Sequence, residues 1–475
     1  MIIPHQIEKI LDDWLSPLQE EFPSIYLVGG AVRDQLLMQP SKDIDLVCRN
    51  AAQLAGRLAA RRDATVVVFN KKMDSPCYRV VDKKNPCIFV DVALLRGDHI
   101  IDDLKGRDFT INAMAIPIES GKIGDHIIDP LNGENDLKQG LVKMAAPGAI
   151  TEDPLRVLRA VRFAAELNFK IDPPTLGAMK DRAPLLDRVP AERIWPELLA
   201  ILNTKKSSFF IRLMDHLTIL EALFPEINGM KGCVQNDFHH LTVWEHSLAV
   251  MSHCEQILEH LEDHFDRHVG NIEKNLAGHN RQALLKLSAL FHDVGKPPSR
   301  QQDDHTGKTT FYNHDQAGRR MVPALARRLK MSNREQAFIE ILIAEHLHVS
   351  NLLPPEVKAS TRMQWFRRHE DDAIPIIILA MADIRGKLGP LSDKNVRNQN
   401  LQRAGELIHS YYGQIRQHIK QADLIKGKDL MALGMAPGAA MGYVLGQVRQ
   451  ARDDGLVSSR EDALDLIKKL APPSD

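Results

Sequence analysis

Residues 25–47 read IYLVGGAVRDQLLMQPSKDIDLV, and this stretch decides the fold of the N-terminal part of the chain. An apolar run is followed by Gly29 and Gly30 and then by apolar residues at helical spacing, which predicts a strand that turns directly into a helix. A second apolar run carries Asp43 and Asp45, and alternate residues of a strand point to the same face. Two such carboxylates can hold Mg²⁺ while leaving coordination positions for phosphate oxygens. The stretch therefore predicts a magnesium site.

The residues around this stretch extend the prediction. Over residues 25–144 short apolar runs alternate with helical ones, which is typical of a small domain with a mixed sheet. Asp91, in the later run IFVDVALL, is the candidate for the third carboxylate of a two-metal site. The turn at Gly29 and Gly30 would let backbone N–H groups approach a triphosphate, and Arg33 would neutralise phosphate charge.

The rest of the chain has helical periodicity. Strand signals nearly vanish from Thr151 onward, and a loop rich in Gly and polar residues around 226–240 marks a boundary. The last helices are broken at GMAPGAAMG. We expect an α+β fold with a small mixed-sheet head followed by helices only. The expected segments are a head at 1–150, a helical neck at 151–230, a helical domain at 231–400 and a helical tail at 401–475.

Composition narrows the class of protein. A chain of 475 residues is too long for one ordinary core, and a net charge of −1 means that any RNA contact requires a local basic surface. The five cysteines form no C-x-x-C pair, so neither a zinc ribbon nor a disulfide framework is indicated. The N-terminus MIIPHQIEKILDDWL is unlike a signal peptide, and no apolar run is long enough for a membrane span. We expect a cytoplasmic protein without a membrane partner.

The block EDPLR contains a pair of residues suited to choosing a nucleobase. Asp153 and Arg156 lie three apart and would share one helical face. Cytosine and adenine each present an amino donor beside a ring-nitrogen acceptor, whereas uracil and guanine present the reverse polarity. An acceptor from Asp153 and a donor from Arg156 would therefore favour C and A. The alternative is that Asp153 caps a helix whose first residue is Pro154, and both roles can hold together.

The helical domain carries ordered His and Asp blocks. They read WEHSLAV, LSALFHDVGK, FYNHDQAG, IAEHLH and MADIRG. A single His is more often an ordinary core or surface residue, but five such blocks in order favour a metal centre. Imidazole together with carboxylate suits Mn, Fe, Ni or Zn, with Mg²⁺ as a further option where carboxylates dominate.

Several ordered blocks of the first half of the chain resemble a known family. They read LVGGAVRDQLL, KDIDLV, GRDFTINAMA, IDPLNGENDL, EDPLRVLRAVRFAAEL and PAERIWPEL, and together they span roughly residues 25–200. They resemble the class II tRNA nucleotidyltransferases and bacterial poly(A) polymerases, which belong to the polymerase-β-like superfamily. The resemblance implies that the first block binds triphosphate and the second binds the metals. Arg107, Asp108 and Asn112 match the block that contacts ribose and phosphates. Gly106 stands where the family usually has Arg, which puts one of these contacts in question.

The same resemblance gives roles to the neck. Asp153 and Arg156 match the family's amino-acid template for nucleotide choice, with Glu152 and Arg159 in support. Arg193, with Glu197, matches the block expected to brace the template helix. A surface ion pair is the alternative for these two residues, because an i, i+4 pair forms easily.

The His and Asp blocks resemble an HD-type phosphohydrolase, a domain attached to this kind of head in some bacterial enzymes. The resemblance implies that His246, His292, Asp293 and Asp383 bind one metal and that His314 and His346 line a second. Lys296 would hold a phosphate, and the centre would activate water against a phosphoester. The tail resembles the C-terminal segment of the same long enzymes. Its Pro437-Gly438 loop would contact RNA backbone, with simple helical packing as the equal alternative.

The resemblance implies template-independent addition of CTP, with ATP as a further substrate, to the 3′ end of tRNA at a Mg²⁺ site. Only VALLRGDHIIDDLKG separates Asp91 from Arg107, and it lacks the Asp-, Gly- and Arg-rich segment associated with complete CCA-adding members. We therefore favour CC addition. Complete CCA addition, poly(A) synthesis and a nucleotide-sensing regulator with only the HD centre active stay open. The sequence does not predict the oligomeric state.

Overall fold

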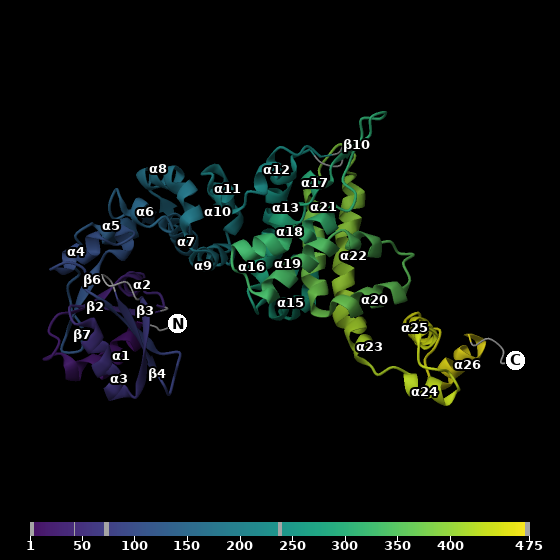
Figure 1. The fold of residues 1–475 in the computed structure, drawn as a ribbon, viewed down its shortest axis with the longest axis horizontal. Coiled ribbons are helices and arrows are strands. Elements are labelled where there is room, and N and C mark those ends of the chain that lie inside the picture. Colours follow the sequence, from purple (N-terminus) through teal and green to yellow (C-terminus); the bar gives the residue numbers. More distant parts are fainter. Residues whose placement is uncertain (1–3, 42, 71–75, 236–239, 471–475) are drawn as a thin grey trace. The chain divides into compact units, whose positions relative to one another are not determined.

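The computed structural model describes residues 4–41, 43–70, 76–235 and 240–470. The chain forms two compact units. One consists of Met1–Thr204 with Leu213–Leu223, and the other of Lys205–Arg212 with Phe224–Asp475 (Figure 1). Strands gather in the first unit and helices fill the second, so the expected α+β class is confirmed. The finer division into four domains stays a prediction.

The first unit is built on a mixed seven-stranded sheet in the order β3-β4-β5-β2-β1-β6-β7. Its strands are β1 Ile25–Val28, β2 Ile44–Cys48, β3 Ala64–Asn70, β4 Cys77–Asp82, β5 Phe89–Leu94, β6 Ala115–Glu119 and β7 Lys122–Ile123. Strands β2 and β5 pair in parallel, whereas all other neighbours in this sheet are antiparallel. The parallel pair places two runs that are distant in sequence side by side.

Short helices complete the head. They are α1 Pro4–Leu15, α2 Gly30–Leu36, α3 Ala51–Arg62, α4 Ile100–Lys105 and α5 Gly133–Lys138. Strand β1 turns into α2 at Gly29, whose φ of 69° lies in the left-handed region that favours glycine. A Cβ at Gly29 would also lie only 2.9 Å from Arg107 Nη1. The predicted strand-turn-helix unit is therefore present, and glycine is required at its turn.

The neck continues the first unit. Its helices are α6 Ala149–Glu152, α7 Arg156–Leu167, α8 Pro173–Arg182, α9 Ala191–Leu202 and α11 Ile219–Leu223. Helix α10, Ser207–His216, is divided between the two units. Helix α7 buries an apolar face that includes Val157, Leu158 and Val161, and it packs against α9. Two strands of two residues each, β8 Leu141–Val142 and β9 Lys170–Ile171, also pair in parallel. A two-residue strand is too short to show alternation, so the sequence pattern did not reveal this pair.

The second unit packs helices around α21 Ala373–Gly386, which is buried along almost its whole length. Such a helix is apolar on all sides because neighbours surround it. Those neighbours include α13 Val243–Glu259, α16 Arg281–Phe291, α19 Asn333–Glu345 and α22 Lys394–Ser410. The unit also contains α12 Ile227–Lys231, α14 Glu262–Phe265, α15 Val269–Leu276, α17 Lys296–Ser299, α18 His314–Arg328, α20 Ala359–His369 and the strand pair β10 Gln301–Gln302 and β11 Thr309–Thr310. The loop expected around residues 226–240 thus contains a short helix, α12.

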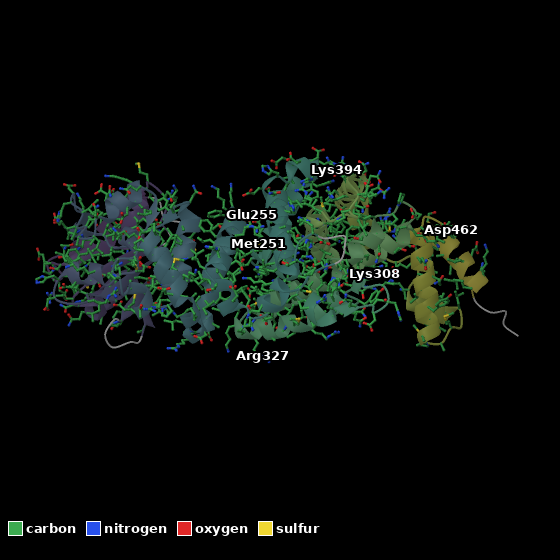
Figure 2. All side chains as sticks on the ribbon, turned by 90° about the horizontal axis from the view of Figure 1, so that it is seen from above. Met251, Glu255, Lys308, Arg327, Lys394 and Asp462 are labelled. Atoms are coloured by element: carbon green, nitrogen blue, oxygen red, sulfur yellow. The ribbon has the colours of Figure 1, made fainter. Side chains whose placement is uncertain are left out.

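A buried charge cluster anchors α13 within this unit. Met251 and Glu255, labelled in Figure 2, lie one turn apart on α13 and are both buried. The Glu255 carboxylate accepts hydrogen bonds from Ser207 Oγ at 2.6 Å and Lys286 Nζ at 3.1 Å. The charged groups of the cluster are thereby paired within the apolar interior.

The tail has a hydrophobic core of its own. After α23 Arg416–Lys420 come α24 Gly427–Ala432, α25 Ala439–Asp453 and α26 Arg460–Leu470. The core residues are Ile425, Leu430, Met441, Val444, Val448, Ala451, Val457, Ala463 and Ile467. The break expected at GMAPGAAMG occurs before Ala439, with Pro437 and Gly438 between α24 and α25. Among the described residues no helix is both long and apolar enough to cross a membrane.

Candidate functional site

The structure places the two strand carboxylates of the head side by side. Asp45 on β2 and Asp91 on β5 are register partners in the parallel pair, so their side chains project from the same face. Burial, the nearby Asp91 and, more weakly, Asp43 raise the pKa of Asp45 to about 7. Asp43 and Asp91 thus both repel the half-buried Asp45 carboxylate, a charge arrangement that a divalent cation would stabilise. The residues present therefore fit a metal.

Arg79 is a member of this site that the sequence did not suggest. It stands opposite Asp91 in the antiparallel β4–β5 pair and donates to both carboxylate oxygens, at 2.8 and 2.7 Å. The only signal in the sequence is a single charged residue within the apolar run CYRVV. Among the described residues, the groups of three or more possible ligands whose atoms lie within 4.8 Å of one another do not include the head carboxylates.

An open cavity of about 470 Å³ lies in the same unit. Five arginines dominate its wall, and the complete lining is Arg96, Arg107, Asp108, Asp153, Leu155, Arg156, Arg159, Arg193, Pro196 and Glu197. Six residues predicted to bind nucleotide therefore meet at one place: Arg107, Asp108, Asp153, Arg156, Arg159 and Arg193. The volume is in the range of small-ligand sites, and the positive charge suits a nucleotide.

Two other residues predicted to bind nucleotide, Arg33 and Asn112, form hydrogen bonds within the chain, and their contact with a nucleotide stays a prediction. Arg33 donates to Asn112 Oδ1 at 2.8 Å and to Asp34 Oδ1 at 2.6 Å, and its side chain is only 11% exposed. Asn112 donates to Asp108 Oδ1 at 3.2 Å, and Arg159 pairs with Asp108 Oδ2 at 2.7 Å. Burial opposes the ionisation of Asp108, but Arg159 nevertheless holds its pKa below the usual value. Arg33 thus holds Asn112, and Asn112 holds Asp108, which lines the cavity.

The template pair lies at the cavity without forming a direct bond between its members. Asp153 Oδ2 pairs with Arg193 Nη2 at 2.6 Å, and Asp153 Oδ1 accepts from the backbone N–H of Leu155 at 3.3 Å. Arg156 donates to the carbonyl oxygens of Gly106 and Ala149, both at 3.1 Å. Asp153 therefore lines the cavity and holds the turn before α7, but its side chain does not cap α7.

Two expectations for the neck need correction. Helix α7 begins at Arg156, two residues after Pro154, because Asp153 and Pro154 form the turn between α6 and α7. Of the two bracing residues, Glu197 contacts α7, where it accepts from Arg159 at 3.3 Å and from Arg162 at 2.6 Å. Arg193 instead holds Asp153. Glu152 is exposed and lies outside the cavity lining, with Arg156 at 3.6 Å.

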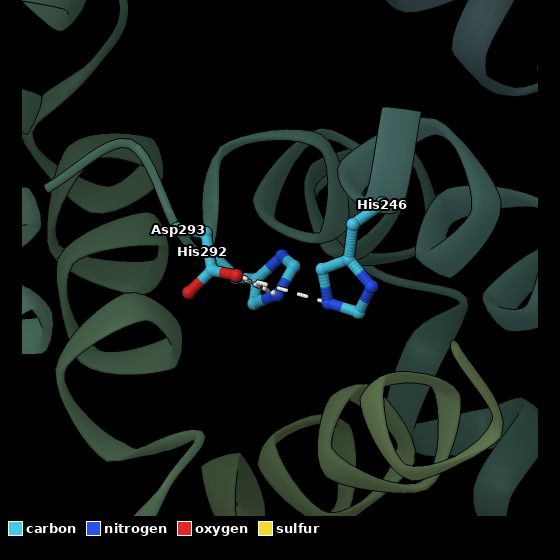
Figure 3. Close-up of side chains that lie close together, drawn as sticks. All are labelled: His246, His292 and Asp293. Carbon is cyan, nitrogen blue, oxygen red and sulfur yellow. Dashed lines mark ion pairs between the residues drawn. The ribbon is translucent and has the colours of Figure 1, made fainter. Parts of the chain in front are cut away.

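The second unit brings together four His and Asp residues from three distant positions of the chain. His246 Nε2 is 3.1 Å from Asp383 Oδ1 and 3.7 Å from Asp293 Oδ2, and His292 Nε2 is 3.1 Å from Asp293 Oδ2. Figure 3 shows His246, from α13, pointing toward the consecutive residues His292 and Asp293 at the end of α16. All four residues are buried. The HD blocks therefore meet at one point of the fold.

A second group shares Asp293 with the first. His314 Nε2 lies 3.2 Å and His346 Nε2 3.9 Å from Asp293 Oδ1. The Nδ1 atoms of His292, His314 and His346 are 2.8, 2.7 and 2.7 Å from backbone carbonyl oxygens, so the ring proton belongs on Nδ1. Their Nε2 atoms are buried and have no hydrogen-bond partner within the described chain. Three unsatisfied ring nitrogens beside a carboxylate fit a metal centre.

Two lysines balance the charge of the HD centre. Lys296 Nζ pairs with Asp293 and Lys387 Nζ with Asp383, each at 2.6 Å. Although burial opposes it, these and the histidine contacts hold the pKa values of both Asp residues well below the usual range. Burial lowers the pKa of His346 to about 3, with the neighbouring His292 adding to the effect. Lys387 follows the MADIRG block directly, but only the fold shows that it reaches Asp383.

Comparison with known proteins finds family matches over the segments that contain both sites. Residues 25–143 match the poly A polymerase head domain, residues 168–230 the probable RNA and SrmB-binding site of polymerase A, and residues 243–384 the HD domain. The chain is 30% identical to an A-adding tRNA nucleotidyltransferase of Deinococcus radiodurans over 96% of this chain and 97% of that protein.

The chain belongs to the class II tRNA nucleotidyltransferase family.

Further family members support the same assignment. A multifunctional CCA protein of Xanthomonas campestris is 31% identical over 90% of this chain and 99% of that protein. A CC-adding tRNA nucleotidyltransferase of Thermus thermophilus is 28% identical over 92% of this chain and 91% of that protein. The solved structure of a Thermotoga maritima CCA-adding enzyme with tRNA shares the fold, with a TM-score of 0.66, 23% identity and coverage of 98% of this chain and 95% of that one. This nucleotidyltransferase therefore combines the family's head with an HD domain.

Proposed function

We propose that the head adds CMP from CTP to the 3′ end of tRNA, with Asp43, Asp45 and Asp91 as its metal-binding carboxylates. The observation that carries the proposal is the alignment of Asp45 with Asp91 in one unit with an arginine-lined cavity. When bound there, Mg²⁺ would activate the terminal hydroxyl group of the RNA and neutralise the triphosphate. Arg79, which contacts both oxygens of Asp91, is suited to hold that carboxylate in its orientation.

Arg107 is the proposed contact to the triphosphate. Its Nη1 atom lies next to Gly29, where a Cβ would be 2.9 Å from it and 3.5 Å from Asp45 Oδ2. Arg107 thus connects the cavity wall with the carboxylates. Because Gly29 has no side chain, a phosphate group can approach between these two residues.

Asp153 and Arg156 are the proposed base-selecting pair. The Arg193 ion pair fixes the Asp153 carboxylate, which can accept from the amino group of C or A. The Gly106 and Ala149 carbonyl groups fix Arg156, whose guanidinium can donate to the ring nitrogen. Preorganised partners discriminate well because a wrong base leaves them unpaired. Glu152 lies outside the cavity lining and is assigned only a supporting charge.

The connection after β5 supports CC addition over complete CCA addition. Strand β5 ends at Leu94 and α4 begins at Ile100, so only residues 95–99 lie between them. Helix α4 then leads almost directly to Arg107. A site that accepts both C and A requires readjustment, and this short, helical interval offers no long loop for that purpose.

Three transcripts of one tRNA, ending at the discriminator base, at the first C and at CC, test the proposal with each labelled nucleoside triphosphate in turn and with CTP and ATP together. CC addition predicts two C residues on the first transcript, one on the second and no A on the third. Addition of A to the third alone would assign the activity of the Deinococcus radiodurans relative. The Asp45→Asn variant is the matched inactive control.

The same assay distinguishes the remaining candidate functions. A first transcript that gains a complete CCA end would show complete CCA addition. A long A tail on unrelated RNA would show poly(A) synthesis. Incorporation of no nucleotide at all would favour a nucleotide-sensing regulator in which only the HD centre is active. Each of these three results would contradict CC addition.

We also propose that the HD centre hydrolyses phosphoesters with a divalent metal held by His246, His292, Asp293 and Asp383, with His314 and His346 at a second position. The unsatisfied Nε2 atoms of three histidines support this proposal. Imidazole ligands favour Mn, Ni, Fe or Zn, whereas Mg²⁺ would rely on the two carboxylates. Lys296 Nζ, 2.6 Å from Asp293, is placed to attract a substrate phosphate.

Metal titration of the whole chain and of His346→Ala tests this second centre. The variant should lose bound transition metal and the hydrolysis of bis(p-nitrophenyl) phosphate while it keeps CTP incorporation. His348→Ala, two residues further on and 47% exposed, is the matched control and should behave like wild type. Equal metal binding by wild type and His346→Ala would contradict the assignment.

A further inference from the structure

Arg96 is an arginine of the cavity wall that lies outside the proposed triphosphate and base contacts. It belongs to the connection between β5 and α4, outside the sequence blocks of the family. It lines the same cavity as Arg107 and Arg156, and its side chain is 40% exposed. Within the described chain its Nη2 group has no hydrogen-bond acceptor, so this donor is available to a molecule in the cavity.

A buried carboxylate fixes the direction of Arg96. Asp103, whose side chain is only 2% exposed, accepts from Arg96 Nε at 3.1 Å through Oδ1. Its other oxygen, Oδ2, accepts from Arg107 Nε at 3.1 Å and Arg107 Nη2 at 3.0 Å. One buried negative charge therefore orients two guanidinium groups, and the three side chains together keep a positive charge at the cavity.

Gly106 has no side chain, and the Arg96 guanidinium lies beside its backbone. Arg96 Nη1 is 3.4 Å from the Gly106 carbonyl oxygen, to which Arg156 Nη2 also donates at 3.1 Å. A Cβ on Gly106 would lie 3.6 Å from Arg96 Nη1, so any longer side chain there would compete with the guanidinium for space. Arg96 thus stands between the proposed triphosphate contact, Arg107, and the proposed base contact, Arg156.

We propose that Arg96 binds the incoming nucleoside triphosphate and that Asp103 is the positioning residue that aims it. This role rests on the proposed nucleotidyltransferase function of the head. Arg96 supplies the cationic contact at the place where Gly106 provides no side chain. A charged hydrogen bond to a nucleotide is among the stronger single contacts, and its loss weakens binding measurably.

The test compares Arg96→Ala with wild type in steady-state CTP incorporation. The KM for CTP should rise about 10-fold to 100-fold, as expected for one charged contact, while the KM for tRNA stays within about 2-fold. Calorimetric binding of CTP to the free protein should weaken to a similar extent. Arg96→Lys, which keeps the charge, should lie between the two. Arg188→Ala, at a side chain 77% exposed in the same unit, is the control and should leave both KM values unchanged.

Two results would overturn the proposal. An unchanged KM for CTP in Arg96→Ala would show that the guanidinium does not contact the nucleotide. A rise confined to the KM for tRNA would assign Arg96 to the RNA instead. Thermal unfolding of the variant near the wild-type temperature excludes a folding defect as the cause of weaker binding. Wild type that incorporates neither CTP nor ATP would contradict the proposed function itself, and CTP binding by calorimetry would still test Arg96 separately.

Discussion

Replacing Glu197 by Gln should both destabilise the first unit and weaken nucleotide binding. The Glu197 side chain is only 12% exposed, and it accepts from Arg162 Nε at 2.6 Å and from Arg159 Nη1 at 3.3 Å. Arg33, Arg159 and Arg162 all lie over the ring of Phe163, at 5.2, 5.2 and 4.2 Å from its centroid. Three positive charges therefore crowd one ring, and Glu197 neutralises part of them.

The size of the effect follows from the partners that remain. Complete loss of a buried ion-pair partner costs about 3–5 kcal/mol, but Arg159 keeps Asp108 at 2.7 Å and Arg162 keeps Glu166 at 2.8 Å. We therefore expect a loss of about 1.5–3 kcal/mol in the free energy of unfolding, the usual range for a hydrogen bond to a charged group. For a unit of this size that corresponds to a fall of about 3–10 °C in Tm.

The assay is thermal unfolding together with CTP kinetics. The KM for CTP should rise, because Arg159 lines the cavity and loses one of its two anchors. Glu166→Gln is the matched control, since its carboxylate pairs with Arg162 at i, i+4 near the surface and its loss should cost only about 0.5 kcal/mol. An unfolding free energy of Glu197→Gln within about 0.5 kcal/mol of the control would refute the assignment of Glu197 as the brace of α7.

Three further predictions concern the proposed sites. Asp45→Asn should abolish nucleotide incorporation while tRNA binding in a filter assay stays near wild type, and substantial incorporation by this variant would exclude the carboxylate mechanism. Asp153→Ala should reduce the preference for CTP over UTP by about 10-fold or more, since one charged hydrogen bond is lost, and unchanged selectivity in competition assays would leave Asp153 only its structural contacts with Arg193 and Leu155. Asp293→Asn should remove metal from both positions of the HD centre, because Asp293 belongs to both groups of ligands. Elemental analysis measures the metal content, and CTP incorporation should be retained. Full metal content in this variant would contradict the role of Asp293 as a shared ligand.

The sequence by itself predicted those features that depend on local spacing. Alternation along a strand predicts that Asp43 and Asp45 share one face, but the strand β2 begins only at Ile44, whereas Gly29 does mark the turn at which φ must be positive. Helical spacing likewise identified the neck, the HD region and the tail. These patterns can be read from the sequence because they are properties of a single strand, turn or helix.

Tertiary structure alone decided which of these elements meet. His246 and Asp383 lie 137 residues apart and still contact each other at 3.1 Å, a distance set by the packing of α13 against α21. Arg79 reaches Asp91 through the register of β4 and β5, two strands that the sequence does not pair.

The directions of two arginine side chains also depend on the tertiary structure. The sequence indicated Arg33 as a phosphate contact, but folding turns it inward to Asn112, whereas Arg96, which no block suggested, lines the cavity. Both directions depend on buried carboxylates, Asp34 and Asp103, that hold the guanidinium groups. Charge partners are chosen by proximity in space, and spacing along the chain fixes that proximity only within one helix or strand.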